Sequence, residues 1–151
     1  ELSSCWGLRS KLGKMGIRQN VFKAVFNLLD TNKPSGWNIR ASLNNYDSTF
    51  PTLVVNKALV EDERDTHGKA TGAKNVSIVI EVVTHIKSAP EKMDEGKDNV
   101  HETLTADSSF NSLYTSNDLT FVSLTDIGEA ERDINGQMYR SSRMVLRLLK
   151  A

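Results

Sequence analysis

Apolar and polar residues alternate along three stretches of the chain, with the period of two that marks a β-strand with unlike faces. The stretches are 36–43, 75–87 and the closing segment that follows a predicted tight turn at Asn135-Gly136. The stretch 75–87 is apolar on one face and half apolar on the other, so we expect it to be a central strand. Further strands are predicted at 50–60 and at 119–125, the latter followed by an acidic segment.

The closing segment is predicted to have one face toward the core and one face toward something else. The core face would hold Met138, Met144, Leu146 and Leu148, and the other face Tyr139, Ser141, Arg143, Val145 and Arg147. Arginines on a regular strand add nothing to the core of a monomer. We therefore expect Arg143 and Arg147 to face a neighbouring molecule or an aqueous channel.

Two helices are indicated by residues that recur at three- and four-residue spacings. In the first helix, the apolar face is formed by Ile17, Val21, Ala24, Val25 and Leu28 and widened by Phe22, Phe26 and Leu29. The second, within 88–106, begins with a predicted capping box at Ser88-Ala89-Pro90-Glu91. Met93, Val100 and Leu104 supply its apolar stripe, and Gly96 is expected to weaken it.

This order of elements predicts an α+β fold, with a mostly antiparallel sheet and the two main helices packed on one side. Residues 17–151 would form a single domain, preceded by an arm or short helix at 1–16. The polar segment 61–75 has no apolar periodicity and is predicted to be an extended, exposed loop. Its acidic residues lack the ligand spacing of an EF-hand calcium loop.

Composition narrows the classes of function. The chain has 151 residues, of which 38% are hydrophobic, and its 19 basic and 19 acidic residues cancel. This balance disfavours a general nucleic-acid binder and suits a protein that associates. Cys5 is the only cysteine, so no intrachain disulfide or cysteine-based zinc site is expected. No apolar run approaches the roughly 20 residues of a membrane-spanning helix.

Catalytic signatures are scarce. The histidines are not spaced as a helical metal site, and the sequence contains neither a phosphate-binding loop nor a nucleophile elbow. Asp47, Glu81 and His85 are the residues around which a small metal-dependent enzyme could be built, but the lysine expected near such carboxylates does not follow Glu81. We therefore predict no catalytic residues, no metal and no cofactor.

Three short motifs, in order, give the chain a resemblance to a known family. Phe50-Pro51 opens a strand, Val82-Val83-Thr84 ends the central strand before a helix, and Tyr139-Arg140-Ser141 lies in the closing strand. Over residues 17–149, this order and spacing resemble the tail terminator and tail-completion proteins of long-tailed bacteriophages. Each motif alone is a generic strand.

The resemblance implies an α+β subunit of a homo-oligomeric ring, usually a hexamer, without enzymatic activity. Such a ring sits on the last disc of the tail tube, stops its polymerisation and joins tail to head. The implied partners are further copies of the chain, the tail tube protein and a neck or head-completion protein. No membrane and no sequence-specific nucleic acid are implied, although DNA can pass through the ring lumen. The implied location is the virion, with assembly in the host cytoplasm.

Candidate interface residues follow from the residue pattern and from the resemblance together. A contact with another subunit or with the tube is predicted for Tyr139, Arg143, Arg147, Glu61, Asp62, Glu63 and Arg64. The alternatives left open are another neck ring, such as a head-closure or connector protein, and the small metal-dependent enzyme. The position of the chain in a particle would distinguish a tail terminator from another neck ring, and replacement of Glu81 would test the enzyme.

Overall fold

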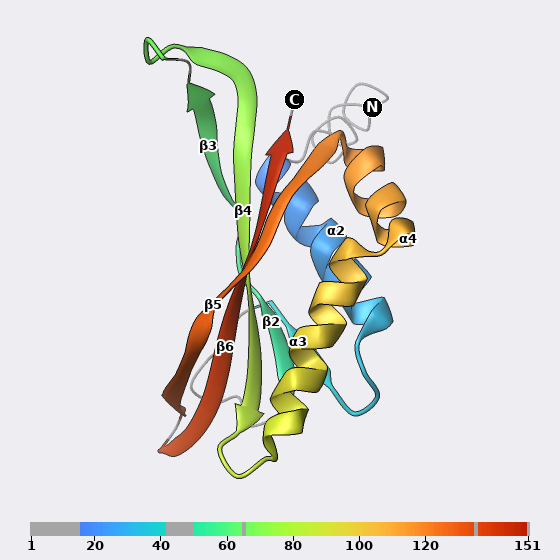
Figure 1. Ribbon diagram of the computed structural model, residues 1–151, viewed down its shortest axis with the longest axis vertical. Coiled ribbons are helices and arrows are strands. Elements are labelled where there is room, and N and C mark those ends of the chain that lie inside the picture. The colour runs from blue at the N-terminus through green and yellow to red at the C-terminus, as the bar shows by residue number, and fades with distance from the viewer. Residues whose placement is uncertain (1–15, 42–49, 65, 135, 151) are drawn as a thin grey trace, which may run out of the picture.

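The chain folds into one six-stranded sheet with helices on one side. A computed structural model describes residues 16–41, 50–64, 66–134 and 136–150. The predicted α+β class is confirmed (Figure 1). The predicted N-terminal arm lies almost wholly outside the described residues.

The elements follow one another along the chain in the order α2, β1 to β4, α3, three short helical turns, β5 and β6. Their bounds are α2 Ile17–Asn32, β1 Asn38–Arg40, β2 Thr52–Val55, β3 Leu59–Arg64, β4 Ala70–His85, α3 Pro90–Thr105, α4 Asp107–Ser109, η1 Phe110–Tyr114, η2 Thr115–Asn117, β5 Leu119–Ile134 and β6 Gln137–Lys150. The predicted strand at 50–60 is thus two strands, β2 and β3. In the described part of the predicted strand at 36–43, the strand is β1, and residues 42 and 43 lie outside the described residues.

The sheet has the order β1-β2-β4-β6-β5, and β3 pairs with the first half of β4. β1 and β2 are parallel, and the other pairs are antiparallel. β4 lies between β2 and β3 on one side and β6 on the other, so the prediction of a central strand is confirmed. The long β5–β6 hairpin forms the opposite side of the sheet and leaves one edge of β5 unpaired within the described structure.

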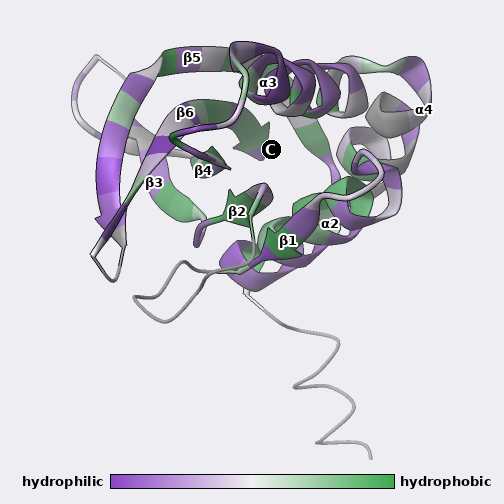
Figure 2. Cartoon of the chain, turned by 90° about the horizontal axis from the view of Figure 1, so that it is seen from below, coloured by the Kyte–Doolittle hydropathy of each residue, from purple (hydrophilic) through white to green (hydrophobic). Residues whose placement is uncertain are grey.

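The core lies between the sheet and the two main helices. From α2 it takes Val21, Val25 and Leu29, all at most 2% exposed. From α3 it takes the predicted stripe of Met93, Val100 and Leu104, also at most 2% exposed. In Figure 2 the strands β2 and β4 are largely hydrophobic, whereas α3 is largely hydrophilic. The buried stripe of α3 is therefore narrow, and most of its surface faces away from the sheet.

The alternation predicted for the closing strand is confirmed over most of its length. Met144, Leu146 and Leu148 are at most 4% exposed and belong to the core under the helices. Met138 was wrongly placed in this core, because its side chain is 41% exposed. Met138 is on the same face of β6 as the buried residues, but it lies where the strand begins, opposite Asp133 of β5.

Two segments differ from their predicted form. The acidic segment after Thr125 continues as strand, since β5 runs to Ile134. The segment 61–75, predicted to be an extended loop, is a β-hairpin formed by β3 and the start of β4. Because β4 pairs with β6 only from Lys74 onward, the hairpin projects beyond the body of the sheet (Figure 1). We call residues 61–73 the β3–β4 arm.

The start of α3 also differs from its predicted form. Pro90 occupies the first turn as predicted, but the residue before the helix is Ala89, and no side chain caps the helix there. The predicted capping box is therefore wrong. Gly96 is buried, and a side chain there would meet Trp37 and Val82 of the sheet.

No helix in the described part of the chain has both the length and the apolar character needed to cross a membrane.

Candidate interaction surface

The sheet has a second face, turned away from the helices, on which no described helix lies (Figure 1). We call it the outer face. On β4 and β6 it carries odd-numbered residues, because the even-numbered ones form the core under the helices. The predicted contact residues Tyr139, Arg143 and Arg147 all lie on this face. The period of two was sufficient to place them together.

A carboxylate is buried on the outer face between two arginines. Glu81 on β4 is only 6% exposed. Its Oε2 lies 2.6 Å from Nη1 of Arg132 on β5, and its Oε1 lies 3.5 Å from Nε of Arg143 on β6. A buried carboxylate is stable only when charged partners replace water. The cluster therefore links the three neighbouring strands β4, β6 and β5.

An aromatic cluster lies at one end of the outer face. The rings of Phe50 and Tyr139 are stacked with centroids 4.0 Å apart, and His85 lies edge-on to Tyr139 at 5.3 Å. Val54 and Val83 complete the cluster. Tyr139 is 3% exposed, and its hydroxyl donates to Gln137 Oε1 at 2.7 Å. Its ring is already packed within the chain.

Arg147 lies at the other end of the outer face and is exposed. In register it lies between Ser77 of β4 and Ser123 of β5, so small polar residues surround it. Its side chain makes no ion pair within the described part of the chain. Arg143 is 53% exposed and shares Glu81 with Arg132. Of the three arginines on the outer face, Arg147 is therefore the one most available to a partner.

A shallow hollow of about 410 Å³ lies beside Arg132 and Arg143, where β5 runs along β6. It is lined by Ile127, Gly128, Glu129, Ala130, Glu131, Arg132, Ser141 and Arg143, so acidic and basic residues both border it. Gly128 has a φ of 113° and sits at a register shift between β5 and β6. This bulge and the small residues leave the surface open along β5.

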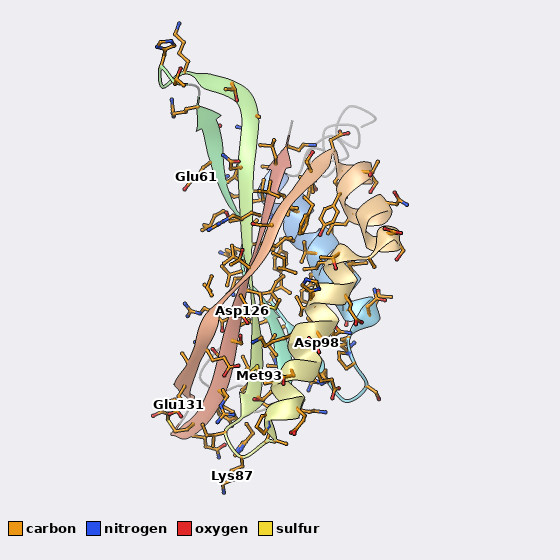
Figure 3. The ribbon with its side chains drawn as sticks, viewed as in Figure 1. Glu61, Lys87, Met93, Asp98, Asp126 and Glu131 are labelled. Atoms are coloured by element: carbon orange, nitrogen blue, oxygen red, sulfur yellow. The ribbon has the colours of Figure 1, made fainter. Side chains whose placement is uncertain are left out.

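The other predicted contact residues lie on the β3–β4 arm, away from the arginines. Glu61 is exposed on β3 (Figure 3), and Asp62 pairs with Lys74 at 2.8 Å. Arg64 Nη1 donates to the carbonyl oxygen of Gly68 at 2.8 Å, within the hairpin. Glu63 is part of β3, and its side chain is not described. The arm and the arginines of the outer face are thus two separate candidate surfaces.

Sequence reasoning missed Arg132 as a functional residue. It lies in the acidic segment after the predicted strand 119–125, for which the sequence pattern indicates no strand pairing, so its position opposite Tyr139 on β5 could not be predicted. Glu81 was considered as a metal-binding carboxylate, but both of its oxygens face guanidinium groups. Asp47 lies outside the described residues. Within the described ranges, no three histidine, cysteine or acidic side chains gather as a metal site would require.

A separate ion-pair cluster fixes α3 to the helix side of β5. Lys97 Nζ lies 2.6 Å from Asp126 Oδ2 and 3.6 Å from Glu129 Oε1. The hydrogen bond from Lys97 holds the pKa of Asp126 below its ordinary value of 3.8. The same bond raises the pKa of Lys97. The pair is therefore fully charged across the neutral range.

Replacing Asp126 by asparagine is expected to lower the free energy of unfolding by about 0.5–1 kcal/mol near neutral pH, a range discounted because the pair is partly exposed. Because the folded pKa of Asp126 is depressed, this stabilisation exists above the unfolded pKa and is lost as the pH falls through the folded one. Urea unfolding at about pH 7 and about pH 2 should show the difference only at the higher value. Asp133→Asn, at an exposed position of the same strand that makes no ion pair in the described structure, is the control. An equal effect of Asp126→Asn at both pH values would contradict the ion-pair account.

Comparison with known proteins adds one distant likeness. No protein-family model and no curated protein matches the chain. A chain of the structure described as "Virion of native gene transfer agent (GTA) particle" is similar, with 15% identity and a TM-score of 0.46. The match covers 88% of this chain and 94% of that chain. A likeness of this strength does not assign a function.

Proposed function

We propose that the chain is a virion structural protein of the tail–neck junction, a tail terminator that forms a ring on the end of the tail tube. The observation that carries this proposal is the outer face of the sheet, which combines exposed arginines with an open hollow and has no described helix packed on it. The resemblance of the sequence to tail terminators supplies the class of assembly.

A ring subunit needs two unlike lateral surfaces, because a head-to-tail contact joins one patch to a different patch on the next copy. The outer face and the helix layer lie on opposite sides of the sheet (Figure 1). The β3–β4 arm adds a third surface that extends beyond the body. A two-stranded ribbon is only marginally stable alone, so contact with a partner would stabilise the arm.

The residues that carry the resemblance are close together in space. Phe50, Val83 and Tyr139 come from three separate motifs and meet in the aromatic cluster of the outer face. They support the sheet beside the arginines rather than form a reactive centre. This arrangement supports a role in architecture and assembly over the metal-dependent enzyme.

The proposal is tested by removing the protein during virion assembly. Without it, tail tubes should continue to polymerise past their normal length and should fail to join heads. Supplying the intact chain should restore tubes of uniform length. Tubes of normal length that still lack heads would instead favour the other neck ring, and normal, complete virions would exclude both roles.

A further inference from the structure

One side of α3 is a continuous acidic stripe. Glu91, Glu95, Asp98 and Glu102 recur at spacings of four, three and four residues, which places them on one side of the helix. All four are exposed, and they lie opposite the buried residues Met93, Gly96, Val100 and Leu104. Figure 3 labels Asp98 on this helix. We call these four residues the acidic stripe.

The acidic stripe is largely unneutralised within the chain. Glu95 accepts a hydrogen bond from Trp37 and lies 3.8 Å from Lys92, but Glu91, Asp98 and Glu102 make no ion pair in the described structure. Lys97 is engaged by Asp126 and Glu129 instead. Like charges at these spacings disfavour a helix, and acidic residues near its C-terminus oppose the helix dipole. A partner carrying positive charge would remove this cost.

The outer face of the sheet has the complementary charge. It carries Arg132, Arg143 and Arg147 on β5 and β6, of which the first two share the carboxylate of Glu81 on β4. Glu129 and Glu131 of β5 border the hollow beside them, so Arg147 supplies the charge that is not balanced within the chain. The Cα atoms of Arg143 and Arg147 are four residues apart on one strand, or about 13 Å. The acidic stripe extends about 16 Å from Glu91 to Glu102. The two surfaces therefore match in length as well as in sign.

The acidic stripe and the arginines lie on opposite sides of one chain, so they cannot meet within it. We propose that the outer face binds the acidic stripe of a second copy of this chain, in a head-to-tail contact. Each copy then offers one surface of each kind, and the repeated contact closes into a ring if the rotation allows it. Zero net charge of the whole chain agrees with this pairing of opposite faces.

Charge reversal tests the contact through self-association measured by sedimentation at low and high salt. Arg147→Glu should weaken self-association about tenfold, and Asp98→Lys should do the same, because each places like charges in the contact. The two changes combined in one chain should restore most of the lost affinity. Arg18→Glu on exposed α2 makes the same charge change outside the contact and should have little effect. Losses that add instead of cancelling in the double variant would overturn the proposal.

Disulfide trapping gives a second, independent measurement. In a Cys5→Ser background, Asp98→Cys with Arg147→Cys should oxidise into a ladder of covalent oligomers, because each chain bonds to two others. Either cysteine alone should give no product above a dimer. The pair Arg18→Cys with Arg147→Cys is the matched control. A double variant that stops at the dimer, or a control that gives the same ladder, would count against the head-to-tail contact.

The proposed contact would join neighbouring copies in the ring, and in that respect it rests on the proposed function. Different results would exclude the contact and the terminator role. A chain that assembles through these surfaces and never caps a tail tube would keep the contact and exclude the terminator role. A terminator whose ring tolerates both charge reversals would keep the role and exclude the contact.

Discussion

Replacing Gly96 by alanine is expected to lower the free energy of unfolding by about 2 kcal/mol, although the same change at an exposed helix position raises it by up to about 1 kcal/mol. A Cβ at residue 96 would lie 2.4 Å from Trp37 Cη2 and 2.6 Å from Val82 Cγ1. Both distances are too short for carbon atoms in contact, so the helix or its neighbours must move. Urea unfolding of the two proteins measures the difference.

Trp37 has little freedom to make room. It is 3% exposed, and its Nε1 donates to Glu95 Oε1 at 3.1 Å on the same helix. Trp37→Phe removes the part of the ring nearest Gly96, so Gly96→Ala should cost less in that background. Asp94→Ala, at an exposed position of α3, is the control for helix propensity. A Gly96→Ala protein at least as stable as the parent would show that the packing has been misjudged.

Arg132→Ala is the second large expected effect, a loss of about 1–2 kcal/mol in the free energy of unfolding. The change leaves the buried carboxylate of Glu81 with Arg143 alone, at 3.5 Å. Removing one partner of a buried pair costs about 3–5 kcal/mol, but Arg132 is 34% exposed and water compensates in part. Thermal or urea unfolding gives the value directly.

Arg147→Ala is the matched control, because Arg147 lies on the same face without an ion pair in the described structure. It should change the free energy of unfolding by no more than about 0.5 kcal/mol. In a Glu81→Gln background, Arg132→Ala should lose most of its effect, since no buried charge remains to be neutralised. Equal losses for Arg132→Ala in both backgrounds would assign its role to packing.

The regular elements could be predicted because they face one core. The alternation in β4 and β6 and the helical stripes of α2 and α3 each follow from contact with the same apolar layer. β5 could not be predicted beyond Thr125, because register shifts at Phe121/Ser123 and Asp126/Gly128 break its period of two. The β3–β4 arm packs on no core, so it has no apolar pattern to detect.

The candidate surface was predictable only within a single strand. Arg143 and Arg147 share a face because they are four residues apart in β6. Their relation to Glu81 and Arg132 depends on the pairing of β4, β6 and β5, which no local pattern specifies. The close packing of Gly96 was not predictable for a similar reason, because its neighbour Trp37 comes from a distant part of the chain.

Electron microscopy of assembled particles tests the central claim most directly. Particles made with the intact chain should show it as a closed ring between the end of the tail tube and the neck, with the outer face of each copy against a neighbouring copy. A particle in which the chain is absent, or lies at another position as separate copies, would contradict the account.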